Sequence, residues 1–472
     1  MDATLVTGWE ALCQLLSPAF TGPTFITFLH IATGWVLCRS RPTVTNLICT
    51  IGSSLLDHAS RHWTVYEKFF YRAAWSLPHV SRLLLTRVMV PLIDRCAIGS
   101  AGPNGAGSTI DLDIDDTTCG RCGKHVAYAG YFKDASASNT LKTVVHWAHN
   151  WVIGCVAMRD RRWPKWVIGL PVLFTLYRKP KDCSPAHPFL TRQQIAARMI
   201  LDTRDALPGR TIRVAADGQY ATREVVQAVG KASAAVEAAQ SNLVSRLRSD
   251  AAIYQLPPQR KRFKRGRRKK RGRRLPTPKQ LAARRKEGWR TIKVLAYGKL
   301  VQRRVLSVVC LWYHVSKDKP IKLLIVRDPS GRQKDDYLFC TDPAVPDEQI
   351  VERFAARWPI EQCIHDGKQL GGFEQVQGWC RRTVERQAPF ALIVQTLVKA
   401  WYLLHGADAA SAQPKGAQVC GWMLEKDHPS YLDMLATLRR VLWTYRIKCN
   451  STLGGRVGRL LEPLRFTLCA AA

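Results

Sequence analysis

Three acidic positions far apart in the chain carry the side chains that phosphate chemistry needs. They are the Asp115-Asp116 pair, Asp217 and Glu361. The pair ends an alternating stretch typical of a strand, Asp217 follows a short apolar stretch, and Glu361 lies in a helical pattern. Carboxylate oxygens are preferred ligands of Mg²⁺, and one or two of them with a substrate phosphate hold the ion. If these carboxylates meet in the fold, they can hold divalent metal against a phosphodiester.

The first acidic position offers two candidate ligands. Successive side chains of a strand point to opposite faces, so Asp115 shares one face with Asp111 and Asp113. Asp116 lies on the other face if the strand continues. Asp217 precedes a glycine, and an Asp-Gly step is also common in an ordinary turn. Position alone is therefore consistent both with a metal site and with unrelated structural acids.

Two basic residues flank Glu361 at helical spacing. Lys368 lies seven residues on, two turns along the same helix face, and can reach a phosphate oxygen as a point charge. Arg357 can grip a phosphate with two hydrogen bonds. The alternatives are a solvated surface lysine, and a structural ion pair of Arg357 with Glu352 or Glu361. Pro359 fits best in the first turn of a helix, so we expect the helical pattern to break just before it.

Strand and helix patterns alternate from residue 109 onward, which indicates an α/β core. The predicted strands are residues 110–115, 126–132, 151–158, 167–177 and 211–216, and the predicted helices are 190–207, 221–239, 347–357, 360–370 and 389–404. We place the first part of the core at 109–254 and its last part, with the Glu361 helix, at 346–405. The intervening residues 255–345 form a basic, mostly β insertion, with predicted strands at 292–295, 304–315 and 321–327.

Helical patterns flank this core on both sides. We interpret residues 1–98 as a separate all-helical domain, the glycine-rich 99–108 as a linker, and 406–472 as a helical C-terminal tail. Residues 11–38 contain no Asp, Glu, Lys or Arg, but prolines and glycines interrupt them, so they predict buried helices and not a membrane span. The first residues do not show the pattern of a secretory signal, so we expect none. The 15 cysteines are scattered, which is typical of reduced thiols in the cytoplasm.

The charge of the chain predicts a polyanionic partner. The formal net charge is +35, from 71 Lys and Arg against 36 Asp and Glu. Such an excess binds nucleic acid because each neutralised phosphate releases condensed counterions. From Arg260 to Arg274, 12 of 15 residues are basic and none is acidic. The candidate DNA-backbone contacts in this run are Arg265, Arg267, Arg268, Lys269 and Lys270. They would give affinity and no sequence reading, and the alternative is a solvated loop without a role.

Two further groups of residues carry weaker signals. Cys119, Cys122 and His125 resemble half of a zinc site, but a structural zinc needs four ligands and a partner pair at a suitable spacing is not evident, with His146 and His149 as the conceivable partners. We therefore interpret the cysteines as two loop thiols. The tryptophans at 147, 151, 163, 166, 358 and 379 are typical of core positions, and wedging of an unpaired base is the alternative role.

Taken in order, these motifs resemble the DDE transposases of bacterial insertion sequences. The YREK signature of that group spaces an aromatic residue, an Arg, the catalytic Glu and a Lys, and this chain has Phe354, Arg357, Glu361 and Lys368 in those places. Phe replaces the usual Tyr, so a hydroxyl is missing. The insertion-sequence-701-like branch is the most similar, through its Asp-Asp/Glu-Thr and Ala-Asp-x-x-Tyr blocks. The matching blocks are 114–118 and 214–220, with further elements at 41–45, 73–76, 266–272, 341–342 and 384–386.

The resemblance implies a fold and a site. It implies an RNase H-like core whose sheet edge brings together Asp115, Asp217 and Glu361 as catalytic residues and metal ligands. It implies Mg²⁺ or Mn²⁺ as cofactor, with two ions. Because the family varies between Asp and Glu at the second place of the first block, it favours Asp115, with Asp116 as the alternative.

The resemblance also implies an activity. We expect a DNA transposase with endonuclease activity that hydrolyses the inverted-repeat ends of its element and then joins the freed 3′-OH to target DNA. The N-terminal helices would read the ends, the protein would act as a homodimer on DNA without a membrane partner, and it would lie in the bacterial cytoplasm at the nucleoid. The alternatives are a catalytically silent DNA-binding protein derived from a transposase, and a nuclease that cleaves without joining.

Overall fold

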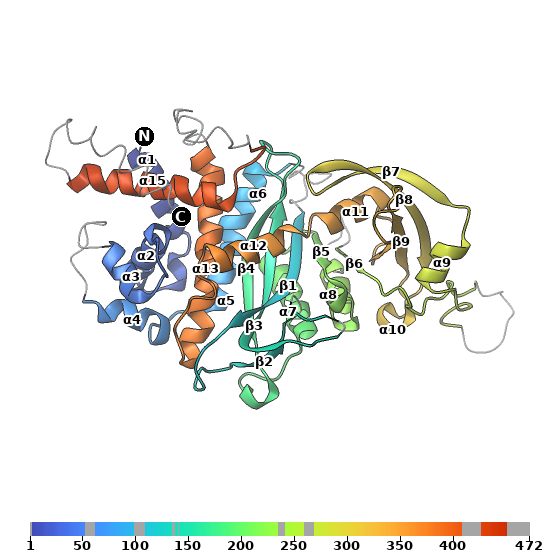
Figure 1. Ribbon diagram of the computed structural model, residues 1–472, viewed down its shortest axis with the longest axis horizontal. Coiled ribbons are helices and arrows are strands. Elements are labelled where there is room, and N and C mark those ends of the chain that lie inside the picture. The colour runs from blue at the N-terminus through green and yellow to red at the C-terminus, as the bar shows by residue number, and fades with distance from the viewer. Residues whose placement is uncertain are drawn as a thin grey trace.

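The computed structural model describes residues 2–51, 62–98, 109–134, 137–139, 141–234, 241–258, 269–407 and 426–450. Figure 1 shows helices from both ends of the chain gathered on one side, a sheet through the middle, and the 255–345 region on the other side. Within the described residues, no helix combines the length and the apolar character that crossing a membrane requires. The apolar segment at 11–38 folds instead into parts of two helices with an intervening turn.

Five strands form the centre of the sheet in the order β4-β3-β1-β5-β6. They are β4 (Ile168–Tyr177), β3 (Val145–Met158), β1 (Ile110–Gly120), β5 (Ile212–Ala216) and β6 (Asn242–Arg246). The pairs β4–β3 and β3–β1 are antiparallel, while β1–β5 and β5–β6 are parallel. This mixed sheet with helices on both faces fits the RNase H-like core that the sequence predicts.

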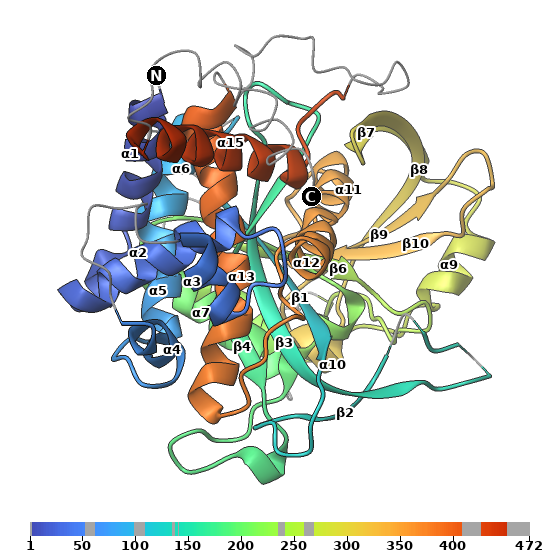
Figure 2. The ribbon, with the colours of Figure 1, turned by 60° about the vertical axis from the view of Figure 1, so that its left-hand side comes forward.

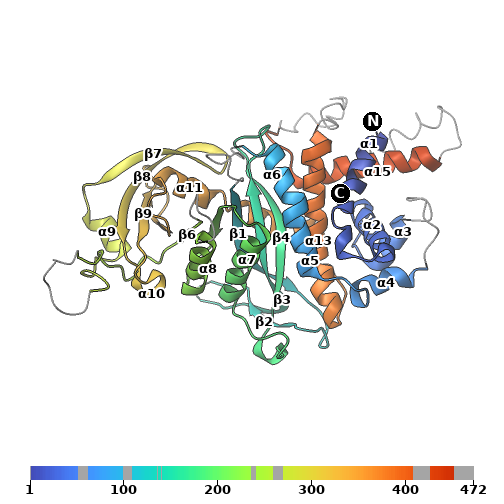
Figure 3. The same cartoon turned by 180° about the vertical axis from the view of Figure 1, so that it is seen from behind.

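Helices cover both faces of this sheet. Helices α7 (Arg192–Ala206) and α8 (Arg223–Ser233) pack together on one face, which Figure 3 shows from behind. Thr191 caps α7 through a capping box with Gln194, which ends the preceding loop at a defined residue. Helices α11 (Asp347–Ala355) and α12 (Pro359–Gln369) lie on the opposite face and contact β5 and β1 respectively. The break between them falls at Pro359, as the sequence predicts.

The N-terminal helices share a hydrophobic core with the rest of the protein. They are α1 (Asp2–Gln14), α2 (Gly22–Leu37), α3 (Val44–Ile51), α4 (Thr64–Tyr71), α5 (Leu77–Leu83) and α6 (Val90–Cys96). Figure 2 shows them around the long helix α13 (Arg381–Trp401), with α15 (Tyr431–Asn450) beside them. The rings of Phe28, Phe69 and Phe70 all contact Phe390 of α13 edge-on. The described residues before 98 are largely helical, as expected, but their core continues into α13 and the sheet.

The insertion extends the central sheet. Its strands are β7 (Trp289–Ala296), β8 (Lys299–Cys310), β9 (Ile321–Arg327) and β10 (Asp336–Cys340), with short helices α9 (Pro278–Arg284) and α10 (Tyr313–Ser316). Strand β10 pairs with β6 of the core on one side and with β9 on the other. The β-rich character of the region is therefore as predicted, and the ladder between β6 and β10 joins it directly to the central sheet.

Several predicted boundaries are wrong. The strand expected at 126–132 is only Gly130–Lys133 (β2), because residues 123–129 form turns in which Tyr128 has a positive φ of 63°. The helix expected at 221–239 ends at Ser233, and the strand expected to reach residue 315 ends at Cys310. Helix α13 begins at Arg381 and carries Pro389 inside it, although proline usually ends a helix. The linker at 99–108 lies outside the described residues.

Candidate active site

Two of the predicted acids lie side by side where the parallel ladder between β1 and β5 ends. In the β1–β5 ladder, Ile114 pairs with Ala216, so the next residues in register are Asp115 and Asp217. Asp217 is the first residue after β5 and precedes a 3-10 turn, η5 (Gly218–Tyr220). Because neighbours in register share a face of the sheet, both carboxylates belong to the face that α11 and α12 cover.

The third acid joins them through a shared arginine. Arg357 Nη1 donates to Asp115 Oδ2 over 3.1 Å, and Nη2 of the same guanidinium donates to Glu361 Oε1 over 2.6 Å. Burial alone lowers the pKa of Arg357, but the carboxylates of Asp115, Glu361 and Asp217 outweigh it and raise the pKa above the usual value. Two of the three predicted acids therefore contact one buried guanidinium, and the third is close enough to raise its pKa.

A second arginine, one turn earlier on α11, fixes the approach of these helices to β1. Arg353 Nη2 lies 2.7 Å from Asp113 Oδ1, and Arg353 Nε lies 3.5 Å from Asp111 Oδ1. Asp111 is also held by Arg213 of β5 at 2.6 Å. Arg353 and Arg357 are four residues apart, one helical turn, and they pair with alternate aspartates of β1, Asp113 and Asp115. These ion pairs fix the position of α11 and α12 on β1, and so the position of Glu361 on α12.

Burial changes the proton affinity of the acids on β1. It raises the pKa of Asp115 to about 7, against the opposing effect of Arg357. It raises the pKa of Asp113 to about 7 as well, against the opposing effect of Arg353. Burial acts in the same direction on Asp111, but Arg353 and Arg213 outweigh it and its pKa is lowered. An added cation beside Asp115 would favour the charged carboxylate for the same electrostatic reason as Arg357 does.

The donor set fits a hard divalent cation, although Arg357 fills part of the space. Among the described side chains, none donates a hydrogen bond to the Asp217 carboxylate or to Glu361 Oε2. Those oxygens are of the kind that Mg²⁺ and Mn²⁺ prefer. In the part of the chain that the structure describes, no three His, Cys, Asp or Glu side chains are already grouped tightly enough to hold a metal. Metal binding would therefore require Arg357 to move away from at least one carboxylate.

Asp116, the alternative to Asp115, lies on the opposite face of the sheet. Its carboxylate faces α7, where Arg192 Nη1 donates to Oδ2 over 2.7 Å. Three other side chains also donate to it. These four donors use the acceptor sites that a metal would need, so the geometry favours Asp115 as the candidate ligand.

Lys368 and Phe354, the other two residues that match the YREK signature, contact neighbouring parts of the fold. Lys368 Nζ donates to the Thr118 carbonyl over 2.7 Å and pairs with Glu374 at 2.9 Å, which ties the end of α12 to β1. Phe354 is buried, and the guanidinium groups of Arg246 and Arg357 lie 5.3 and 5.8 Å from its ring centre. The ring that replaces the usual tyrosine therefore packs against cations.

The residues of the possible zinc site do not gather. Cys119 is buried in β1 and Cys122 is exposed in the following loop. His149 is buried beside Cys119 in the β1–β3 ladder, but its Nε2 contacts the Ala127 carbonyl at 2.8 Å. Burial lowers the pKa of His149 to about 4, so it is neutral at pH 7. The interpretation as two thiols without zinc fits these contacts.

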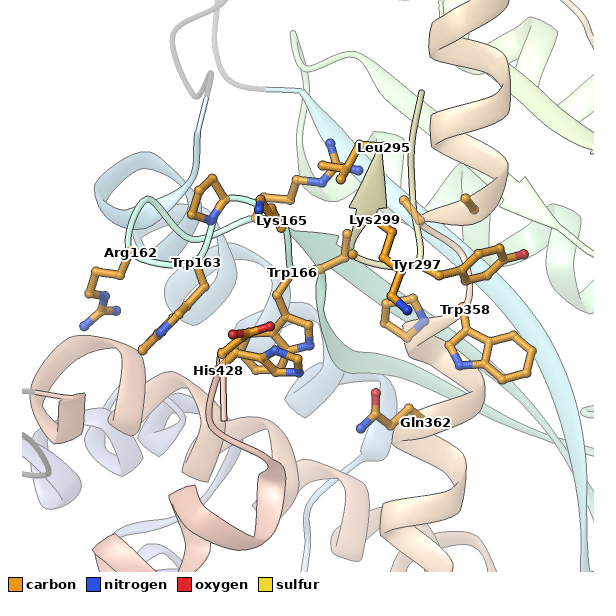
Figure 4. Close-up of a pocket in the computed structure, with 18 residues that line it drawn as sticks. Arg162, Trp163, Lys165, Trp166, Leu295, Tyr297, Lys299, Trp358, Gln362 and His428 are labelled. Carbon is orange, nitrogen blue, oxygen red and sulfur yellow. The ribbon is translucent and has the colours of Figure 1, made fainter. Parts of the chain in front are cut away.

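A pocket of about 590 Å³ lies beside the junction of α11 and α12 (Figure 4). We call it the aromatic pocket. It is lined by residues 159 and 162–167 between β3 and β4, residues 295 and 297–299 at the β7–β8 turn, residues 355, 356, 358, 359 and 362, and residues 427 and 428. Its cations are Arg159, Arg162, Lys165 and Lys299, against Asp427 as the acid. A cation-rich pocket lined with aromatic rings is suited to nucleic acid.

The rim of the aromatic pocket is built from exposed aromatic rings. Trp358 immediately precedes α12, and its side chain is 52% exposed. Its ring packs edge-on against that of Tyr297, with the ring centres 6.2 Å apart. Tyr297 and Gly298 form the two-residue turn between β7 and β8, both with positive φ. Sequence reasoning missed Tyr297, although the Tyr-Gly step between two strand patterns was the available signal.

Three of the five predicted DNA contacts, Arg265, Arg267 and Arg268, lie outside the described residues. Lys269 and Lys270 are described and exposed.

Comparisons with known proteins place the chain in a family. A model for the DDE superfamily endonucleases matches residues 16–299, and a model for the archaeal putative transposase ISC1217 matches residues 310–402. Among solved structures, the piggyBac transposase synaptic complex with hairpin DNA is similar with a TM-score of 0.39 and 12% identity, covering 98% of this chain and 76% of that one. No curated protein matches the chain. Because the first model covers more than half of the chain, the protein belongs to the DDE superfamily endonucleases and is a DNA transposase, as the sequence predicts.

Proposed function

We propose that Asp115, Asp217 and Glu361 are the catalytic residues of this transposase and that they hold Mg²⁺ or Mn²⁺, with two ions. The observation that carries the proposal is the shared guanidinium of Arg357, which contacts Asp115 and Glu361 and lies within the field of Asp217. A cation already stabilises this cluster of carboxylates. The same cluster would accept divalent cations when DNA brings further oxygen ligands.

The chemistry follows from the charges of the substrate. When bound, divalent ions would lower the pKa of the attacking hydroxyl and stabilise the leaving oxygen. The carboxylates would orient the attacking water in line with the scissile bond. Hydrolysis of that phosphodiester would free a 3′-OH. In the second reaction that 3′-OH would attack a phosphodiester of target DNA. Arg357, once released from a carboxylate, would reach a phosphate oxygen with a bidentate pair of hydrogen bonds.

The aromatic pocket and the insertion would hold the DNA. The pocket lies against Pro359, two residues before Glu361, so a strand bound at the acids would pass close to it. Its exposed Trp358 and Tyr297 are suited to stack on an unpaired base. Lys269 and Lys270, together with Arg265, Arg267 and Arg268, would contact the backbone. Lys368 would contribute a further positive charge beside β1.

The finer assignments follow from the sequence. We infer membership of the insertion-sequence-701-like branch from the blocks around Asp115 and Asp217. Two ends must be held together for joining, which favours a homodimer on DNA. The helices of residues 1–98 would read the inverted repeats, and the protein would act in the bacterial cytoplasm at the nucleoid.

The test separates a joining enzyme from the two alternatives. Purified protein, a labelled duplex of the element end and a supercoiled target plasmid are incubated with Mg²⁺. We expect a nicked end and a joined product from the wild type, and neither from Glu361→Gln. A pre-cleaved end with a 3′-deoxy terminus should block joining without blocking cleavage of intact ends. Cleavage without joining would support the nuclease alternative, and equal activity of Glu361→Gln would overturn the proposed site.

A silent DNA-binding derivative makes a different prediction. It would bind the end duplex without cleaving it at any Mg²⁺ or Mn²⁺ concentration. A matched control is Glu224→Gln, which neutralises a helix acid on α8, on the opposite face of the sheet from α12. This variant should cut like the wild type.

A further inference from the structure

We propose that Asp116 is a positioning residue that fixes the spacing between Asp115 and Asp217, and that it does not bind the metal itself. This inference rests on the proposed function, because it takes Asp115 and Asp217 as the ligands. It gives Asp116 a role distinct from that of Asp115, whereas the sequence pattern left the two as alternative metal ligands.

The carboxylate of Asp116 joins the middle of β1 to the turn after Asp217. Its Oδ1 accepts hydrogen bonds from Gln219 Nε2 at 2.6 Å and from the Tyr220 hydroxyl at 2.9 Å. Both donors belong to η5, the 3-10 turn that Asp217 precedes. Two consecutive residues of that turn are therefore tied to the residue next to Asp115.

The second oxygen of Asp116 is anchored to the core. Its Oδ2 accepts from Asn150 Nδ2 of β3 at 2.8 Å and from Arg192 Nη1 of α7 at 2.7 Å. The side chain is 7% exposed, so this is a buried charge whose four donors offset its loss of water. A carboxylate with both oxygens occupied in this way is rigid, and any movement of β1 relative to η5 would cost at least one of these bonds.

The backbone completes the arrangement on the catalytic side. The Asp116 N–H donates to Asp115 Oδ1 at 2.9 Å, which fixes the rotation of the Asp115 carboxylate. Ser245 Oγ of β6 donates to the Asp217 carbonyl at 3.1 Å, so that β6 holds Asp217 from the other side. The two proposed ligands are thus restrained through the residues next to them, while Arg357 holds Asp115 Oδ2 and no described side chain donates to the Asp217 carboxylate.

Tyr220 is the donor that can be changed with the least disturbance. Its ring is fully buried, and burial together with Asp116 and Asp115 raises the pKa of its hydroxyl far above 10, so the group donates at any working pH. Tyr220→Phe removes one oxygen and keeps the ring. Partners that orient metal ligands in this way are worth about 10–100-fold in metal affinity.

The experiment compares metal binding with cleavage. Mn²⁺ binding to the protein in complex with the end duplex is followed by the EPR signal of free Mn²⁺, with the duplex alone as background, for wild type, Tyr220→Phe, Asp116→Asn and Asp115→Asn. Cleavage of the end duplex is measured over a range of Mn²⁺ concentrations. We expect Tyr220→Phe and Asp116→Asn to raise the Mn²⁺ Kd about tenfold or more, with kcat at saturating Mn²⁺ within about threefold of wild type. Asp115→Asn should lose both binding and cleavage.

A matched control separates positioning from general stability. The Tyr66 hydroxyl is buried and bonds His30 Nδ1 at 2.9 Å among the N-terminal helices, away from the acids. Tyr66→Phe removes the same atom and should lower the Tm by a similar amount without changing the Mn²⁺ Kd. An unchanged Mn²⁺ Kd in Tyr220→Phe and Asp116→Asn would overturn the inference. Loss of cleavage in Asp116→Asn at every Mn²⁺ concentration would also overturn it, because Asp116 would then act as a ligand. If Asp115→Asn binds Mn²⁺ like the wild type, the proposed function itself fails.

Discussion

The guanidinium of Arg357 lies 3.1 Å from the carboxylate of Asp115, although the two residues are 242 apart in the sequence. The same guanidinium holds Glu361, four residues further along the chain. One side chain on the connection between two helices therefore brings a strand acid and a helix acid together. The arrangement has a testable consequence for catalysis.

Arg357→Lys should lower the rate of end cleavage by about 10²-fold or more. Lysine keeps the charge but is a single point donor, whereas the planar guanidinium bridges two carboxylates and can grip a phosphate. The measurement is single-turnover cleavage at saturating Mg²⁺. Arg198→Lys changes an exposed i,i+4 pair with Asp202 on α7 and serves as the control. A rate within threefold of wild type would show that Arg357 is not needed in the reaction.

Arg353→Ala should lower the free energy of unfolding by about 3–5 kcal/mol, because it leaves Asp113 buried without its partner. Both side chains are almost fully buried, at 5% and 0% exposure. Denaturant unfolding followed by tryptophan fluorescence measures the change. Arg248→Ala, in an exposed pair with Asp250, should have no measurable effect. The double variant Arg353→Met, Asp113→Leu should recover most of the lost stability, and failure to recover would mean that the pair does more than balance charge.

The sequence predicted the central elements well because their patterns are local. The alternation of Ile110, Leu112 and Ile114 with aspartates predicted β1, and all three apolar residues are fully buried. Strands β6 and β10 were missed, since each has five residues and is held by pairing with other strands of the sheet, β6 with β5 and β10 with β9 as well as with each other. The three acids were proposed as a site from their neighbours in sequence. The pairing of Arg353 with Asp113 could not be predicted, because it depends on how α11 lies across the sheet.

Trp358→Ala should weaken binding of single-stranded DNA about tenfold. The loss of one base-stacking surface costs roughly 1–3 kcal/mol, and the exposed ring of Trp358 stands at the rim of the aromatic pocket. Fluorescence anisotropy with a labelled oligonucleotide gives the Kd. Trp379→Ala is the matched control, since that ring is 65% exposed and lies outside the pocket. Equal loss in both variants would argue against a specific pocket.

The two lysines of the aromatic pocket should act through charge alone. Lys165→Gln and Lys299→Gln should each reduce the slope of log K against log salt concentration by about 1, because each removes one phosphate contact. The same anisotropy assay at several salt concentrations measures the slope. An unchanged slope would place the DNA backbone away from this pocket.

Stability should fall in acid partly through His149. Burial lowers the pKa of His149 in the folded protein to about 4, below the usual value of about 6.5, so the unfolded chain takes up a proton first as the pH falls. The stabilisation is fully present above pH 6.5 and is lost progressively down to pH 4, to a total of about 3 kcal/mol. Unfolding of wild type and His149→Gln is compared at pH 7.5, 6, 5 and 4.5. The difference between them should shrink with falling pH, and a constant difference would contradict this role.

The most direct test of the site is to map what a metal touches. Fe²⁺ replaces Mg²⁺ on the protein, ascorbate and peroxide generate radicals at the bound ion, and mass spectrometry locates the cuts in the backbone. We expect cuts near residues 115, 217 and 361 together, all suppressed by excess Mg²⁺ and all lost in Asp217→Asn. Cuts at only one of these places, or a pattern that Asp217→Asn leaves unchanged, would contradict a single site built from the three acids.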